Sequence, residues 1–196
     1  MIIWINGAFG SGKTGTAYEL HRRLPNSFVY DPENVGFFLR KHIPRTMIGD
    51  DFQQLQAWRS CNFSILKMIA EGAEGPIIVP MTVVDPLFFD EIVGELRRAG
   101  IEVNHYALCA SKEVLLGRLK KRFDGPESWA AKQIDRCMEG LSKEVFRLHI
   151  NTDHLSIDQV VEHIAGHAGL ELLPDKRSEA RKLIDRLWTQ LKQIRF

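Results

Sequence analysis

The chain alternates short apolar segments with longer stretches in which apolar residues recur every three or four positions. The apolar segments span residues 2–6, 28–31, 76–82, 102–108 and 148–152. Such alternation is typical of a parallel sheet with helices on both faces, because each parallel strand needs a crossover connection before the next. Residues 77–81 are apolar without alternation, which indicates a strand buried on both faces. The pattern predicts a three-layer α/β/α fold around a five-stranded parallel sheet.

Capping signals predict several helix boundaries. Asp31 and Asp85 each precede a proline, which suits an N-cap followed by the first helical position. Ser156 with Gln159 has the spacing of a capping box. Gly100 follows the predicted helix 86–99, and a further helix is predicted over residues 51–70.

The last predicted helix, residues 177–196, is amphipathic. Its apolar stripe consists of Ala180, Leu183, Ile184, Leu187, Trp188, Leu191 and Ile194. Residues 176–196 hold seven basic and two acidic side chains, a charge of +5, so the rest of the chain carries −4 of the total +1. We therefore expect a domain over residues 1–174 and a separate basic helix over 175–196. Two interpretations of this helix stay open: contact with an anionic membrane surface, or packing on the domain or a second subunit.

Composition narrows the class of protein. The chain has 196 residues, 44% of them hydrophobic and 26% charged, which suits one globular domain. An apolar run of the roughly 18 residues that a transmembrane helix needs does not occur. Cys61, Cys109 and Cys137 are far apart and fit neither a disulfide framework nor a zinc site. We expect a cytoplasmic protein, with a peripheral position on the inner membrane face left open, and no nucleic-acid partner.

A phosphate-binding motif directly follows the first apolar segment. Residues 7–14 read G-A-F-G-S-G-K-T, which matches G-x-x-x-x-G-K-[ST] between a strand and a helix. The predicted cofactor-binding residues are Gly7, Ala8, Phe9, Gly10, Ser11, Gly12, Lys13 and Thr14. Backbone amides of such a loop hold a triphosphate, Lys13 neutralises its β and γ phosphates, and the Thr14 hydroxyl ligates Mg²⁺. The motif predicts ATP and Mg²⁺ as cofactors.

Phosphoryl transfer would also need a carboxylate and further cations near the γ-phosphate. Asp31 is the first candidate because it ends the second strand, at the edge where open α/β sheets bind ligands, although a plain N-cap would explain it too. Asp85 and Asp153 follow later strands and are weaker candidates. Pro80, Met81 and Thr82 occupy the place where a Walker B acid would stand, so the second metal ligand stays open.

Cations gather after the fourth strand. Arg118 and Arg122 are the predicted catalytic cations beside Lys13, with Lys120, Lys121, Lys132 and Arg136 nearby. The loop 123–126 is predicted to let this segment close over the phosphates as a lid.

Large apolar side chains are dense between Asp31 and Leu66. In a small kinase this stretch borders the acceptor site, so the predicted substrate-binding residues are Phe37, Phe38, Arg40, Trp58 and Arg59. Most of the aromatic residues in the stretch are also compatible with a place in the core.

Several segments together resemble one family. The run M-I-I-W-I-N-G-A-F-G-S-G-K-T, followed by E-L-H-R-R-L, V-Y-D-P-E, I-I-V-P-M-T, A-S-K-E and S-W-A-A-K-Q-I-D-R-C, resembles the bacterial tunicamycin-resistance ATP-binding proteins over nearly the whole chain. The resemblance implies a fold similar to nucleoside-monophosphate and shikimate kinases. It also implies protection from tunicamycin, a lipid-tailed nucleoside antibiotic, and an amphiphilic C-terminal helix at the membrane.

Three functions remain open at this stage. The first is an ATP-dependent phosphotransferase that uses a hydroxyl of the antibiotic as acceptor. The second is a protein that binds ATP and the drug without transfer and lowers the free drug by sequestration. The third is a housekeeping nucleotide or metabolite kinase.

Overall fold

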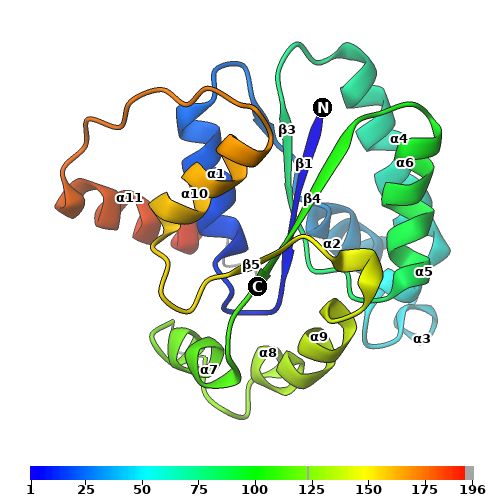
Figure 1. Cartoon of the computed structure of the whole chain (residues 1–196). Coiled ribbons are helices and arrows are strands. Elements are labelled where there is room, and N and C mark those ends of the chain that lie inside the picture. Colours follow the sequence, from blue (N-terminus) through cyan, green and yellow to red (C-terminus); the bar gives the residue numbers. More distant parts are fainter. Residues whose placement is uncertain (123, 193–196) are drawn as a thin grey trace.

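A computed structural model describes residues 1–122 and 124–192, with only the backbone described for residues 190–192 (Figure 1). Phe123, in the predicted loop 123–126, and residues 193–196 of the predicted terminal helix lie outside the described residues.

The described part of the chain forms one parallel sheet of five strands. The strands are β1 (Ile2–Gly7), β2 (Phe28–Val29), β3 (Ile77–Pro80), β4 (Val103–Cys109) and β5 (His149–Asn151). Their order is β2-β3-β1-β4-β5, and every neighbouring pair is parallel. β1 is therefore central, with Ile5 opposite Pro80 on one side and Tyr106 on the other. The predicted five-stranded α/β fold is confirmed.

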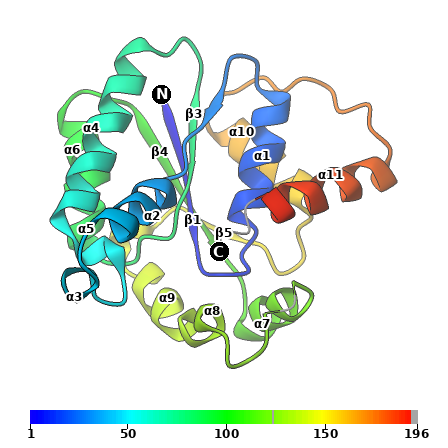
Figure 2. The same cartoon turned by 180° about the vertical axis from the view of Figure 1, so that it is seen from behind.

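Helices connect the strands and cover both faces of the sheet (Figures 1 and 2). They are α1 (Lys13–Arg23), α2 (Glu33–His42), α3 (Arg45–Ile48), η1 (Phe52–Gln54), α4 (Gln56–Gly72), α5 (Pro86–Phe89), the π-helical segment η2 (Asp90–Gly94), α6 (Glu95–Arg98), α7 (Lys112–Lys120), α8 (Trp129–Lys132), α9 (Ile134–Leu141), η3 (Glu144–Phe146), α10 (Ile157–His167) and α11 (Glu179–Lys192). Helices α1 and α10 lie on one face, and α4, α5 and α6 lie on the other.

Side chains of β1 alternate between two hydrophobic cores. Ile2 and Trp4 belong to the core beneath α4 and α6, whereas Ile3 and Ile5 belong to the core beneath α1 and α10. All four side chains are fully buried, so each contributes on the order of 2 kcal/mol to folding. Because β1 is held from both faces, the loop that leaves its carboxyl end starts from a rigid position.

The capping signals agree with the structure at two helices and the boundary of a third differs. Asp85 accepts a hydrogen bond from the Leu87 amide (2.8 Å), and Ser156 forms a complete capping box with Gln159. The helix predicted over 51–70 begins only at Gln56. The Asp51 carboxylate accepts a hydrogen bond from the Gln53 amide (3.0 Å) and caps the short turn η1 instead, so the chain bends before α4.

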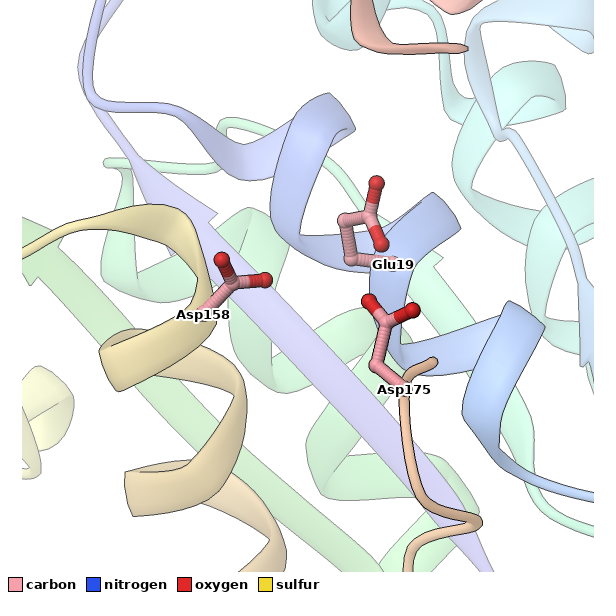
Figure 3. Close-up of side chains that lie close together, drawn as sticks. All are labelled: Glu19, Asp158 and Asp175. Carbon is pink, nitrogen blue, oxygen red and sulfur yellow. The ribbon is translucent and has the colours of Figure 1, made fainter. Parts of the chain in front are cut away.

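An ionic cluster holds α11 against α1 and α10. Three carboxylates converge from separate elements: Glu19 of α1, Asp158 of α10 and Asp175 before α11 (Figure 3). The cations that neutralise them are Arg177, Lys182 and Arg186. Arg186 lies 2.7 Å from Asp158, and hydrogen bonds from Arg177 hold the pKa of Asp175 well below its ordinary range. The charged face of α11 therefore packs on the domain, while Leu183, Ile184, Leu187 and Trp188 face outward and are exposed.

Candidate functional site

The phosphate-binding loop begins where β1 ends, and its glycines have conformations that other residues avoid. The φ angles are 150° at Gly7, 83° at Gly10 and 97° at Gly12. A Cβ at Gly7 would lie 2.8 Å from the Leu108 carbonyl oxygen, and one at Gly10 would lie 2.9 Å from that of Leu115. The tight curl of the loop thus depends on glycine at these positions.

A buried amide fixes the entrance of this loop. The Asn6 side chain accepts hydrogen bonds from the amides of Gly7 (2.8 Å) and Val83 (3.1 Å), and it donates to the Val83 carbonyl oxygen (2.7 Å). Its Nδ2 also lies 3.2 Å from Nε2 of His105, which therefore acts as the acceptor of a neutral ring. Asn6 ties the loop to the segment after β3 and leaves its own polar atoms satisfied.

We expect His105 to make the protein sensitive to acid. Burial lowers the pKa of His105 from 6.5 to about 3, so the unfolded chain binds a proton first as the pH falls below 6.5, and the free energy of unfolding decreases until about pH 3. Between about pH 7 and pH 4 this costs about 3 kcal/mol. Denaturant unfolding of wild type and His105→Gln across this range measures the difference. The exposed His154→Gln serves as the control, and parallel pH profiles of wild type and His105→Gln would contradict the assignment.

The residue that stands in place of a Walker B acid holds the phosphate-binding loop in position. Thr82, just after β3, donates a hydrogen bond from Oγ1 to the Gly7 carbonyl oxygen (2.8 Å). Its own carbonyl oxygen accepts a hydrogen bond from Gln53 Nε2 (3.0 Å). The segment after β3 therefore braces the loop and links it to η1.

Lys13 points back into the loop. Its Nζ donates to the carbonyl oxygens of Gly7 (2.9 Å) and Ala8 (3.0 Å), and it lies 5.6 Å from the centre of the Phe9 ring. Burial lowers the pKa of Lys13 from 10.5 to about 8. An ammonium group held by carbonyl oxygens on the wall of a cavity attracts an anion that enters the cavity.

Nucleotide binding is expected to take up protons near pH 8. With its pKa at about 8, Lys13 is about half protonated there in the free protein, and bound phosphates favour the charged form. Calorimetric titration with Mg-ATP at pH 8, in buffers of different ionisation enthalpy, should show an uptake of about half a proton. The uptake should vanish at about pH 6.5, where Lys13 is already charged. Buffer-independent enthalpies at pH 8 would contradict this expectation.

A cavity of about 200 Å³ lies over the loop. Its lining residues are Phe9, Gly10, Gly12, Lys13, Thr14, Gly15, Tyr18, Asp31, Glu33, Pro80, Arg122 and Ile157. We call it the phosphate cavity. Asp31 lines it while its Oδ1 accepts a hydrogen bond from the Glu33 amide (3.0 Å). The N-cap of α2 is Pro32 and not the predicted Asp31, because the helix begins one residue later, at Glu33. The structure thus brings together seven predicted residues: Phe9, Gly10, Gly12, Lys13, Thr14, Asp31 and Arg122.

A larger cavity of about 700 Å³ adjoins it. Its lining residues are Phe9, Glu33, Phe37, Arg40, Asp50, Asp51, Phe52, Gln53, Met81, Thr82, Trp129 and Gln133. We call it the acceptor cavity. Phe9 and Glu33 line both cavities, so they lie where the two meet.

The structure separates the five predicted substrate-binding residues. Phe37 and Arg40 line the acceptor cavity. Phe38 does not: it is 61% exposed and packs on His42. Trp58 is fully buried and donates a hydrogen bond to the Pro32 carbonyl oxygen (3.0 Å), so it supports the core beneath α2.

Two predicted arginines have structural partners. Arg59 is buried, pairs with Glu91 and donates to the Gln53 carbonyl oxygen (2.5 Å), which holds η1 and α4 together. Arg118 donates to the Oγ1 (3.0 Å) and the carbonyl oxygen (2.5 Å) of Thr152 after β5. Neither side chain lines the phosphate cavity or the acceptor cavity, so we do not carry them into the proposed site.

Sequence reasoning missed several residues of the acceptor cavity. Glu33 was not predicted as a site residue, because an acidic side chain in the first turn of a helix is already explained by its favourable interaction with the helix dipole. Trp129 lies far along the chain, and only the packing of α8 brings it to Phe9. Asp51 was predicted only as the start of a helix, and no sequence pattern pointed to Asp50.

The loop also fits a bound nucleotide. Ser11 Oγ is buried and has no hydrogen-bond partner within the described residues, and a Cβ at Gly12 would meet only open space. The positive end of α1 and Lys13 face the phosphate cavity beside this space. The Thr14 hydroxyl and Asp31 carboxylate line the same cavity and offer the oxygen ligands that Mg²⁺ prefers.

Comparisons with known proteins identify the family and the fold of the chain. A family model described as an AAA domain matches residues 2–143. The solved structure of the tunicamycin resistance protein of Deinococcus radiodurans is 36% identical, covers 89% of this chain and 99% of its own, and superposes with a TM-score of 0.75. Two others share the fold: a gluconokinase from Sinorhizobium meliloti 1021 (15% identity, 96% and 95% coverage, TM-score 0.60) and a shikimate kinase from Bacteroides thetaiotaomicron (20%, 87% and 99%, 0.54). No curated protein matches the chain.

Proposed function

Because the chain belongs to the AAA-domain P-loop family, and within it to the family of the tunicamycin resistance protein, we propose that it transfers the γ-phosphoryl group of ATP to a hydroxyl of a tunicamycin-like nucleoside antibiotic. The observation that carries the proposal is the junction of the two cavities at Phe9 and Glu33. A nucleotide on the loop would direct its last phosphate toward this junction.

The acceptor cavity suits a neutral, hydroxyl-rich molecule with apolar parts. Three acidic residues line it, Glu33, Asp50 and Asp51, against the guanidinium of Arg40, and Asp51 is also paired with Arg136, so one negative charge is left over. Arg40 itself donates to the Asp50 carbonyl oxygen (3.2 Å) and stacks on Phe52. An anionic acceptor such as a nucleoside monophosphate would be repelled by this balance of charge. Carboxylates accept hydrogen bonds from sugar hydroxyls, and the aromatic walls bury apolar surface.

The residues at the junction have different roles in phosphoryl transfer. The acceptor oxygen attacks the γ-phosphorus, the bond to the β,γ-bridging oxygen breaks, and ADP leaves. Glu33 accepts the proton of the attacking hydroxyl, while Lys13 and Arg122 screen the charge that develops on the phosphoryl oxygens. Thr14 and Asp31 would hold Mg²⁺, which supplies further positive charge at the phosphates when bound.

The proposal is tested with purified protein, tunicamycin, Mg²⁺ and γ-labelled ATP. The label should appear on the drug, which gains one phosphoryl group, and nucleoside monophosphates should remain unlabelled. Intact drug despite demonstrated binding would leave sequestration as the function. Labelled nucleoside monophosphates would instead identify a housekeeping kinase.

We also propose that α11 contacts a membrane surface peripherally. Among the described residues, no helix is both long and apolar enough to cross a bilayer. The exposed fractions of Leu187 and Trp188, 51% and 60%, support an interfacial contact through the outward apolar face. In the predicted contact with an anionic surface the basic side chains would meet the headgroups, but Arg177, Lys182 and Arg186 are paired with the domain instead.

Substitution of the outward face should therefore release the protein from membranes. We expect the double variant Leu187→Ser, Trp188→Ser to cosediment with lipid vesicles at least about tenfold less, since burial of the two side chains contributes several kcal/mol. Leu173→Ser, an exposed leucine outside α11, is the control. The ionic cluster stays intact in both variants, so the unfolding temperature should not change. If the double variant and the Leu173→Ser control cosedimented equally with vesicles, α11 would only pack on the domain and would not contact a membrane.

A further inference from the structure

Phe9 stands between the two cavities of the site. It belongs to the phosphate-binding loop, is partly buried, and packs against the hydrophobic core beneath it. Its side chain contributes to the walls of both the phosphate cavity and the acceptor cavity. A group at this position controls what reaches the last phosphate of a nucleotide on the loop.

Trp129 packs against Phe9. It is the first residue of α8 and is 51% exposed, and the centre of its ring lies 5.1 Å from that of Phe9, with the ring planes at 74°. This is the edge-to-face geometry that aromatic pairs favour. Figures 1 and 2 show α7, α8 and α9 together beyond the carboxyl ends of the strands, where they cover the loop.

Within this cover, α7 and α9 are anchored in the hydrophobic core by Leu115, Leu119, Ile134, Cys137 and Leu141, whereas α8 has no buried residue. Arg136 of α9 pairs with Asp51 at 3.2 Å, and this bond joins the cover to the opposite wall of the acceptor cavity. The Arg136 side chain is 49% exposed, and ion pairs at such positions add little stability. The segment that can move to admit an acceptor is therefore α8, which begins with Trp129.

We propose that Phe9 and Trp129 form an aromatic seal that keeps water from the γ-phosphate and so selects the acceptor hydroxyl as the recipient. The inference rests on the proposed function for the placement of the acceptor. In the reaction that the seal suppresses, a water oxygen attacks the γ-phosphorus and the bond to the bridging oxygen breaks. The products are ADP, inorganic phosphate and a proton. Exclusion of water by closed elements is a general means of avoiding this loss.

The test is the release of inorganic phosphate from Mg-ATP in the absence of acceptor. Trp129→Ala should release phosphate at least about tenfold faster than wild type, because the free energy of one aromatic contact corresponds to about this factor in rate. Trp129→Phe should stay near wild type, because a phenyl ring still covers Phe9. Phe38→Ala removes an exposed aromatic side chain outside both cavities and serves as the control. ATP affinity is measured for every variant, and rates are compared at saturating nucleotide.

The outcomes separate the seal from the proposed function. Unchanged or slower phosphate release by Trp129→Ala would overturn the seal, as would equal acceleration by Phe38→Ala. If Trp129→Ala hydrolyses ATP faster but wild type transfers no label to tunicamycin, the seal stands and the proposed acceptor is wrong.

Discussion

Replacing Lys13 by alanine is expected to weaken ATP binding by at least about 100-fold while the domain remains folded. The ammonium group is partly buried beside the loop and hydrogen-bonded to the Gly7 and Ala8 carbonyl oxygens, so it is already positioned for anionic oxygens. Loss of charged hydrogen bonds worth about 3 kcal/mol corresponds to this factor. Calorimetric titration with Mg-ATP measures the change in affinity.

Folding should be insensitive to the same substitution. Lys13 is costly to bury, as its lowered pKa shows, and its removal leaves two carbonyl oxygens at the edge of a cavity that water can enter. The unfolding temperature should therefore stay within a few degrees of wild type. Lys67→Ala, an exposed lysine of α4, is the matched control and should bind ATP normally. If Lys13→Ala bound ATP like wild type, the phosphate cavity would be wrongly assigned.

The second large effect is expected at Glu33. Glutamine at this position keeps the size and the hydrogen-bonding reach of the side chain but accepts no proton, so the transfer rate should fall by about 100-fold or more. Glu33 lies at the junction of both cavities and close enough to Lys13 to raise the lysine pKa, against the larger effect of burial. Affinities for ATP and for the drug should change little. Rates of label transfer and equilibrium titrations, measured on the same preparation, give both quantities.

Two further variants make this prediction specific. Glu127→Gln changes an exposed glutamate that pairs with Lys132 and should leave transfer unchanged. Asp31→Asn keeps the hydrogen bond to the Glu33 amide, because asparagine also accepts a backbone hydrogen bond, and tests the proposed role of Asp31 as a Mg²⁺ ligand. If Glu33→Gln transferred phosphate like wild type, Glu33 would not be the proton acceptor.

The fold could be predicted from the sequence, because the patterns that indicate its strands and helices involve residues that are close together in the chain. Continuous apolar runs such as residues 77–81 predict buried strands, and the motif 7–14 requires a strand before it and a helix after it. Capping at Asp85 and Ser156 depends on a few neighbouring residues and agrees with the structure. These patterns determine the order of the elements and the position of the phosphate cavity.

The acceptor site was harder to predict from the sequence, because it depends on the directions in which side chains point in the folded protein. Arg59 and Phe37 lie in the same stretch between Asp31 and Leu66, yet Arg59 pairs with Glu91 while Phe37 lines the acceptor cavity. Trp129 meets Phe9 across more than half of the chain, through the packing of α8. Glu33 and Asp51 have local roles in a helix start and a turn, and only the folded sheet edge shows that they also face a cavity.

The most direct test of the account is the structure of the protein with tunicamycin and a nonhydrolysable ATP analogue in the presence of Mg²⁺. We predict the triphosphate on residues 7–14 and the antibiotic between Phe37, Phe52 and Trp129, with one hydroxyl in line with the γ-phosphate and hydrogen-bonded to Glu33. An antibiotic bound away from the junction, with every hydroxyl out of reach of that phosphate, would contradict phosphoryl transfer as the function of this site.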